Sequence, residues 1–429
     1  MNYFRAAAAV PFVASKTTCT ALLGVALLST IIFASQARAD PLSFEAAIAR
    51  AQSNAPSLWA KALGAEASRV ARGAAGALPD PKLSLGIDSF PISGPLAFQP
   101  SRDDFTWVRV GISQDIPNPA KRRAQRTRVD ADIAVAVASV VLEARTVEVE
   151  TATAWITLAF AQKRLAALDR VRGGLERVVR TTPAAVAAGN ARPAQTLSGR
   201  QALAELDDRR DELLAAVERA RAVLSRWTGD AEPTIAGTLP SFTVDALSLR
   251  ASVDSNPLLG PVEARIGQVN ADVRLAEADR KSDFGVEATY QHRNPRFGDY
   301  VSAGVTISLP FFTRRRQGAL IAARQAEAGQ VGAEREAARR ALAANLETGL
   351  ADHRMHHEQW MRSRRTLEPL ASERVDLEIA SYGAGRASLV DVAEAHVALV
   401  NAALTTLDRE ALVEIDGAML TFTYRSAAR

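Results

Sequence analysis

The clearest hydrophobic pattern in the chain is a strict alternation between residues 301 and 309. Apolar side chains occupy the odd positions from Val301 to Leu309, and serine, threonine or glycine occupies the even positions. Because successive side chains of a strand point to opposite faces, this alternation predicts a strand with one apolar and one polar face. Pro310 ends the pattern, and an alanine-rich helical pattern follows a short aromatic and basic stretch.

The same pattern occurs earlier in the chain. Gly111 corresponds to Gly304 and Pro117 to Pro310, both at a spacing of 193 residues. Another alternating stretch precedes each of these strands. We therefore expect strands at about 82–90 and 105–116 in the first half, and at about 284–291 and 300–309 in the second. Each is close to the ~9–11 residues that cross a bilayer as a tilted strand.

Long helical patterns follow both strand pairs. The first runs from Pro119 to about residue 188, and a helix with a seven-residue apolar stripe returns to Trp227. The second is expected from about Thr313 to a turn at residues 382–385, with a last helix to about Leu420. A shorter helical stretch with a Ser–Asn–Pro-like break precedes each strand pair, near Pro56 and Pro257.

The two helical turns are also copies of each other. Gly189 corresponds to Gly385 and Leu203 to Leu399, each 196 residues apart. These spacings predict a duplicated unit of about 200 residues, which is typical of a repeat architecture. The predicted division is 40–240 and 241–429, with hairpin tips near residues 189 and 385.

Residues 1–39 have the features of a secretory signal peptide. Basic residues precede an apolar run at 21–34, and Ala37-Arg38-Ala39 provides a small-x-small cleavage site. A retained anchor helix is the alternative, but the run is shorter than the ~20 residues a spanning helix needs. Cys19 is the one cysteine, so the mature chain is expected to have none.

Charge and motifs exclude several functions. The chain has 52 basic and 48 acidic residues, and removing residues 1–39 leaves 49 basic and 48 acidic. A nucleic-acid partner therefore has no electrostatic basis. The sequence has no P-loop, Gly-x-Ser-x-Gly, His-Glu-x-x-His or cysteine pair, so we predict neither an enzyme nor a cofactor.

The strand count predicts an assembly. No later apolar run is long enough to span a bilayer as a helix, so a membrane crossing must use strands. Four strands do not close a barrel, and open edges in lipid leave backbone groups unpaired. Three copies provide about 12 strands, which predicts a homotrimer whose long helices continue the barrel wall as a coiled coil.

These features together resemble one family. The order helix, strand pair and long helical hairpin, given twice, is similar to the outer-membrane efflux (TolC-like) family over essentially the whole mature chain. The matching motifs are the Asn–Pro segments, Pro117, Pro310 and the tip segment 382–395. The resemblance implies a trimer in the outer membrane of a Gram-negative bacterium, with a 12-stranded barrel on a periplasmic helical tunnel. It also implies contact with outer-membrane lipid, a periplasmic adaptor and an inner-membrane RND-type pump.

The resemblance also assigns a periplasmic entrance. A tyrosine of the closing network and two acidic residues of the entrance correspond to Tyr382, Asp391 and Glu394. Six carboxylates around a threefold mouth favour cations and raise some pKa values by repulsion. At the position of the family's locking arginine this chain has Ala387, with Arg386 one residue earlier, and Gln195 stands where the family has the acidic partner. The resemblance therefore implies a weaker or rewired lock. The tips at Gly189, Asn190 and Gly385 are expected to meet the adaptor.

Several classes of transported substrate fit the sequence. Residues 113–123 are similar to the strand end of the heavy-metal (Czc/Cus-type) subgroup, with Ala120 in place of its usual glycine. This favours an exit duct for heavy-metal cations. Drug efflux and type I protein secretion are alternatives, and a soluble periplasmic coiled-coil scaffold is the alternative from another class.

Three further clusters have competing interpretations. His353, His356 and His357 share helical spacing that suits a metal, although a solvated or partner-facing patch is favoured. Two basic runs, 121–123 and 314–316, fit either lipid head groups or solvated first turns. Aromatic residues that fit an interfacial girdle are Trp107, Tyr290, Tyr300, Phe311 and Phe312, with core packing as the rival for the two phenylalanines.

Overall fold

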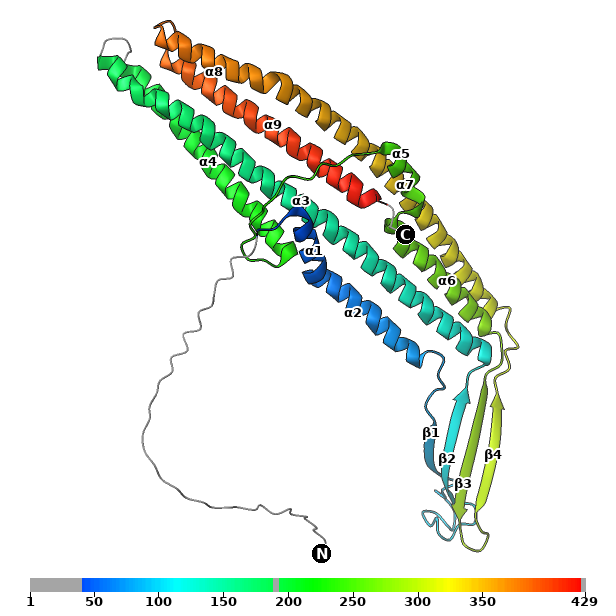
Figure 1. Ribbon diagram of the computed structural model, residues 1–429. Helices are drawn as coiled ribbons and strands as arrows, with labels where there is room; N and C mark the ends of the chain where they lie inside the picture. Colours follow the sequence, from blue (N-terminus) through cyan, green and yellow to red (C-terminus); the bar gives the residue numbers. More distant parts are fainter. Residues whose placement is uncertain (1–40, 188–192, 426–429) are drawn as a thin grey trace, which may run out of the picture. The chain divides into compact units, whose positions relative to one another are not determined.

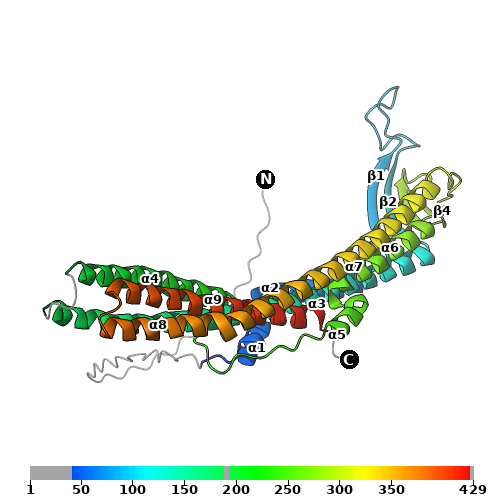
Figure 2. The ribbon, with the colours of Figure 1, turned by 90° about the horizontal axis from the view of Figure 1, so that it is seen from above.

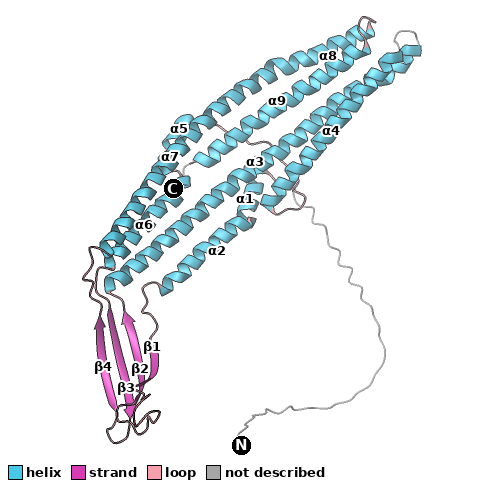
Figure 3. Cartoon of the chain, turned by 180° about the vertical axis from the view of Figure 1, so that it is seen from behind, coloured by secondary structure: helices cyan, strands magenta, loops and turns pink. Residues whose placement is uncertain are grey.

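The computed structural model describes residues 41–187 and 193–425. Helices make up most of this part of the chain, and four strands form one sheet at one end of the long helices (Figure 3). The predicted mainly helical fold with a small β part is therefore confirmed. The predicted signal peptide and the tip residues Gly189 and Asn190 lie outside the described residues.

Elements recur in the same order in both halves of the chain (Figure 1). The first half contains α1 (Phe44–Asn54), α2 (Pro56–Ala71), β1 (Lys82–Asp88), β2 (Trp107–Ile116), α3 (Pro119–Ala187) and α4 (Pro193–Thr228). The second contains α5 (Ala246–Ala251), α6 (Gly260–Ala278), β3 (Phe284–Arg293), β4 (Tyr300–Ile307), α7 (Gln317–Arg362), α8 (Glu368–Gly383) and α9 (Leu389–Tyr424). Pro56 takes the first turn of α2, where its missing N–H costs nothing.

The 69-residue α3 is the element around which the helices are arranged. It packs against α4, α9 and α6, and Figures 1 and 2 show α3 beside α4 and α8 beside α9. The apolar stripe predicted for the returning helix is buried where these helices meet, since Leu206 and Leu213 of α4 pack in one cluster with Leu168 and Leu175 of α3. The predicted helical hairpins are thus confirmed.

The second long helix differs from its prediction. It begins at Gln317 rather than Thr313, and a π-helical turn at Ser363–Leu367 interrupts it before α8. Pro369 follows this turn, and a proline inside a helix removes one backbone donor and crowds the preceding turn. Arg409 of α9 donates to the Ser363 hydroxyl, which fixes the interruption against its neighbour.

The last helix, α9, also differs from expectation. It continues to Tyr424 rather than Leu420, and it is long and apolar enough to cross a membrane by length and composition alone. The expectation that no later apolar segment qualifies was therefore wrong. Within the 18-residue apolar stretch of α9 that meets this criterion, 44% is buried inside the chain, because α9 packs against α3, α7 and α8.

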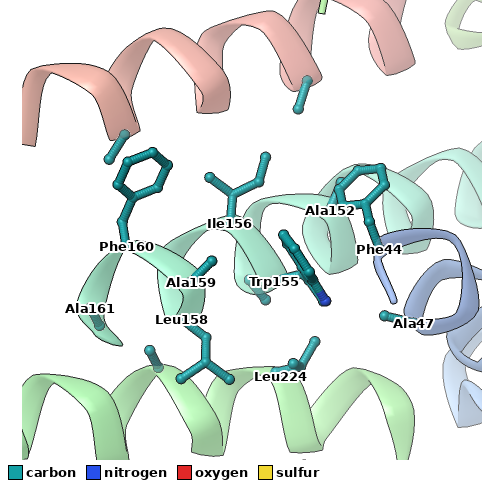
Figure 4. Close-up of a cluster of buried hydrophobic side chains, with 14 of the residues drawn as sticks. Phe44, Ala47, Ala152, Trp155, Ile156, Leu158, Ala159, Phe160, Ala161 and Leu224 are labelled. Carbon is teal, nitrogen blue, oxygen red and sulfur yellow. The ribbon is translucent and has the colours of Figure 1, made fainter. Parts of the chain in front are cut away.

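The main core lies where α1, α3, α4 and α9 meet (Figure 4). Trp155 is 1% exposed, its ring packs edge-on against Phe44 at 5.5 Å, and its indole N–H donates to the Leu42 carbonyl at 3.0 Å. Leu42 also pairs with Ile235, so the start of the described chain and the inter-repeat linker lie together. This core fixes the helices relative to one another.

A buried histidine lies against Gly174, one of two adjacent glycines in α3. His396 of α9 is 3% exposed, and its Nδ1 lies 2.8 Å from the Val392 carbonyl. A Cβ on Gly174 would lie 3.3 Å from His396 Nε2. Gly174 therefore gives the imidazole room between the helices, whereas a Cβ on Gly173 would meet nothing within 4 Å.

Candidate functional site

The strands form one antiparallel sheet in the order β1-β2-β3-β4. Ten residue pairs join β2 to β3, so the two repeats share a continuous ladder. Directly paired residues lie on the same face, and the register therefore assigns every side chain to one of two faces. The outer edges of the sheet are β1 and β4.

One face, hereafter the apolar face, is almost entirely hydrophobic. Its members include Leu83, Leu85, Ile87, Val108, Val110, Ile112, Val286, Tyr290, Val301, Val305 and Ile307. All of these are exposed; Val301 is 78% exposed and Val305 69%. Gln114 and His292 are the polar exceptions. An apolar face of this size in water marks a surface that meets lipid or a partner.

The opposite face, hereafter the polar face, carries small and charged side chains. Its members include Lys82, Ser84, Asp88, Arg109, Ser113, Asp115, Glu287, Thr289, Gln291, Ser302 and Thr306. Lys82 Nζ lies 2.7 Å from an Asp115 oxygen, and Arg109 Nε lies 3.3 Å from an Asp88 oxygen. The alternation read from the sequence is therefore confirmed across all four strands.

The two duplicated positions on the polar face, Gly111 and Gly304, are glycines because neighbouring side chains occupy the space that a Cβ would need. A Cβ on Gly111 would lie 2.7 Å from Ser84 Oγ and 2.9 Å from Thr289 Cγ2. A Cβ on Gly304 would lie 2.8 Å from a Glu287 carboxylate oxygen. Glycine thus permits close cross-strand packing at both equivalent positions.

The register corrects the predicted aromatic girdle. Trp107 pairs with Asp88 and Arg293, and Tyr300 pairs with Gln291, so Trp107 and Tyr300 belong to the polar face. Their assignment to an outward girdle was wrong because each stands one residue out of phase with the apolar positions. Tyr290 does lie on the apolar face.

Phe311 and Phe312 follow β4 and are 77% and 78% exposed, so core packing of these two rings is excluded. Arg314, Arg315 and Arg316 are also exposed. Aromatic and basic side chains together at the end of a strand fit a membrane interface. The other basic run differs, since the Arg122 guanidinium donates to the Gly76 carbonyl at 2.8 Å.

Asn118 ties the sheet to the helices. It is 3% exposed, its side-chain oxygen accepts from the Lys121 N–H, and its amide donates to an Asp283 oxygen at 2.9 Å. Burial acts to raise the pKa of Asp283, but hydrogen bonds from Asn118 and the charge of Lys121 outweigh it and lower that pKa. Lys121 also pairs with Asp279 at 2.8 Å. This junction orients β2 and β3 relative to α3 and α6.

The predicted entrance residues lie around the turn between α8 and α9. Tyr382 is half-buried, and its hydroxyl oxygen has no hydrogen-bond partner within the described residues. Arg386 is exposed, and Gly385 has a positive φ of 71°, which suits glycine in a helix-ending turn. Gln195 lies in the first turn of α4.

Asp391 has a local role that the sequence pattern did not predict. It forms a capping box with Ser388: its carboxylate accepts from the Ser388 N–H at 2.7 Å, and its own N–H donates to the Ser388 hydroxyl. These hydrogen bonds, first the one from the Ser388 backbone, lower the pKa of Asp391 within the single chain. Glu394 is exposed one turn later.

The cap makes the start of α9 sensitive to acid. Because the folded-state pKa of Asp391 is below its ordinary 3.8, the stabilisation is present above pH 3.8 and is lost as pH falls through the lowered value. We expect amide hydrogen exchange at Val392 and Ala393 to accelerate in that range relative to the middle of α9. Asp391→Asn, which keeps a capping acceptor, should remove the pH dependence. Identical pH profiles in both proteins would contradict the capping role.

The histidine cluster does not assemble into one site. His356 Nδ1 lies 2.7 Å from an Asp416 oxygen of α9, whereas the His357 ring packs edge-on against Trp360 at 5.7 Å. Burial lowers the pKa of His353, which lies partly buried near Asp416. Within residues 41–187 and 193–425, no group of three or more His, Cys, Asp or Glu side chains is arranged to hold a metal ion.

Comparison with known proteins identifies the fold. Residues 249–422 match the sequence model of a family described as outer membrane efflux protein. This match bears out the resemblance read from the sequence and the outer-membrane localisation. No curated protein matches the chain by sequence.

Solved structures cover nearly the whole chain. A membrane protein from Pseudomonas aeruginosa has a TM-score of 0.75 at 16% identity, covering 89% of this chain and 90% of its own. The channel-forming protein CusC has a TM-score of 0.75 at 12% identity, with 90% and 92% covered. The Campylobacter jejuni CmeC outer membrane channel has a TM-score of 0.71 at 14% identity, with 90% and 87% covered. At these identities the likeness establishes a shared fold.

Proposed function

We propose that the chain forms the outer-membrane exit duct of a tripartite efflux system, as a homotrimer. The observation that carries this proposal is the four-stranded sheet with one exposed apolar face and two open edges. Three copies joined through β1 and β4 provide twelve strands, a number that closes a barrel and satisfies the backbone groups that lipid leaves unpaired.

The apolar face then meets lipid and the polar face lines the lumen. A soluble coiled-coil scaffold would rarely expose a continuous apolar face with residues such as Leu85 and Val301, so this alternative is disfavoured. Phe311, Phe312 and the three arginines that follow lie at the inner leaflet, where guanidinium groups meet lipid phosphates. The helices α3, α4 and α7–α9 extend the lumen into the periplasm.

The helical turns face the inner membrane. We place the adaptor contact at the turns near residues 189 and 385, and the RND-type pump beyond it. Asp391 and Glu394 provide six carboxylates around the threefold entrance; Tyr382, whose hydroxyl has no partner among the described residues, belongs to the same turn region. Such an entrance favours cations, which fits heavy-metal cargo, while drug and protein cargo remain the alternatives. The duct is passive and catalyses no reaction.

Single-channel recording tests this function. The purified protein should conduct in a planar bilayer, and multivalent cations added on the helical side should block the current. The double variant Asp391→Asn/Glu394→Gln keeps the capping acceptor and removes the charge, so the half-blocking concentration should rise on the order of tenfold. The control variant Glu358→Gln removes an exposed charge from α7. Multivalent cations should block its channels at the same half-blocking concentration as in wild type.

Two results would refute parts of the proposal. The absence of conducting channels would reject the duct itself. Conducting channels whose block is unchanged by the double variant would reject the entrance assignment and leave the duct intact.

A further inference from the structure

The guanidinium group of Arg293 lies among aromatic rings at the loop end of the polar face. The guanidinium carbon of Arg293 is 4.4 Å from the ring centroid of Tyr300, 4.7 Å from that of Phe297 and 5.9 Å from that of Trp107. Trp107 and Tyr300 pack edge-on at 6.5 Å. We call these four residues the outer-end cluster; they come from β2, β3, β4 and the β3–β4 loop.

The aromatic rings hold the arginine in place. Its Nη2 donates to the Tyr300 hydroxyl and to the Phe297 carbonyl at 3.3 Å. Stacking on several rings fixes a guanidinium group and removes water from its faces while leaving N–H donors at its edge. Arg293 Nε is buried, and it has no hydrogen-bond partner within the described residues.

The carboxylates nearest in register are engaged by other groups. Asp88 lies on β1, on the far side of Trp107 from Arg293, and pairs with Arg109 at 3.3 Å. Asp299 accepts from the Tyr290 hydroxyl and lies 2.7 Å from His292 Nδ1, and both of these partners belong to the apolar face. In the described part of the chain, the Arg293 guanidinium forms no ion pair at 4.0 Å or less; the Asp299 carboxylate accepts from the backbone N–H of Arg293 instead.

The polar face therefore changes sign along its length. Asp115 and Glu287 lie near the helical end, where Ser113, Gly285 and Thr306 also line a hollow in the sheet. Small neutral residues such as Thr289 and Ser302 occupy the middle rows of the register. The outer-end cluster occupies the last row, next to the loops.

We propose that the outer-end cluster is an oxyanion-binding ring at the outer mouth of the lumen, contributed by one Arg293 from each subunit. This inference rests on the proposed function, because the polar face lines a lumen only in the closed trimer. The ligand class is a phosphate, sulfate or carboxylate group, which accepts from the guanidinium N–H donors that Tyr300 and Phe297 leave unused. Dissolved anions are the expected source, since Arg293 lies on the polar face rather than on the lipid side.

Inorganic phosphate is the probe for the test. Single channels are recorded in a bilayer of neutral phosphatidylcholine, with phosphate added on the side of the strand loops. Wild-type current should fall with phosphate, and Arg293→Gln should raise the half-blocking concentration at least about threefold. The ratio of potassium to chloride permeability should rise about two- to threefold in the same variant.

Two further variants complete the experiment. Arg296→Gln removes an exposed charge from the same loop and should leave both readouts unchanged. Arg293→Lys keeps the charge but not the planar fork, so it should keep the wild-type permeability ratio and weaken the block.

The outcomes separate the ring from the duct. Arg293→Gln channels with wild-type block and selectivity would overturn the ring while the duct stands. An effect of Arg293 seen only in bilayers with anionic lipid would also overturn it, because the arginine would then serve lipid phosphate. Should Arg293→Gln not assemble, Arg293→Lys decides: a block equal to that of wild type contradicts the proposal. A wild-type protein without conductance would reject the proposed function itself.

Discussion

Replacing Trp155 with alanine is expected to lower the free energy of unfolding by about 3–5 kcal/mol, the usual range for a buried tryptophan. The side chain is 1% exposed, packs against Phe44 and donates to the Leu42 carbonyl. Alanine removes these ring contacts and leaves that carbonyl without its indole donor. The cost is large because α1, α3, α4 and α9 meet at this point.

Trp59→Ala provides the matched control. Trp59 lies on α2 and is 67% exposed in the single chain. Its replacement should change the unfolding free energy by less than about 1 kcal/mol. The measurement is the urea midpoint of the detergent-solubilised protein, followed by near-ultraviolet circular dichroism. Equal midpoints for the two variants would show that Trp155 does not hold the helices together.

Val305→Arg is expected to prevent assembly of the protein in the outer membrane. Val305 is 69% exposed on the apolar face, and an arginine facing lipid near the bilayer midplane costs about 2–4 kcal/mol in each subunit. Three subunits incur this cost together. The SDS-resistant oligomer and the outer-membrane fraction of the protein should both decrease sharply.

Thr306→Arg is the control at the next residue. Thr306 lies on the polar face, and it lines the hollow that also contains Asp115 and Glu287. An arginine there meets carboxylates and water, so assembly should persist. Equal loss of assembly in both variants would contradict the assignment of the two faces.

Much of this structure was predictable because strands and long helices have short sequence periods. The alternation from Val301 to Leu309 specified a two-faced strand, and the repeated Gly111 and Gly304 marked the duplication. The helical stripe with Leu168 and Leu175 became buried between helices as expected. These features depend on neighbours in sequence, which a single chain displays directly.

Contacts between distant segments were not predictable in the same way. Asn118 and Asp283 are 165 residues apart and meet only once the sheet has formed. The capping box of Asp391 with Ser388 is local, but the resemblance pointed only to an entrance role for Asp391. The girdle assignment of Tyr300 failed for a different reason. Its neighbour Val301 already belonged to the apolar series, so alternation alone places Tyr300 on the polar face.

The π-helical turn is an intermediate case. Pro369 is visible in the sequence, but the prediction of one continuous helix from about Thr313 took no account of it. The position of the turn at Ser363–Leu367 depends on Arg409, which comes from a different helix. The sequence therefore contains the proline that disturbs the helix but does not fix where the turn forms.

The oligomeric state of the mature chain, measured by sedimentation equilibrium in a density-matched detergent, tests the central claim most directly. We expect a trimer that forms in detergent and aggregates when the detergent is removed, because each apolar face needs lipid and each sheet edge needs a partner. A folded, stable monomer in detergent-free buffer would contradict it.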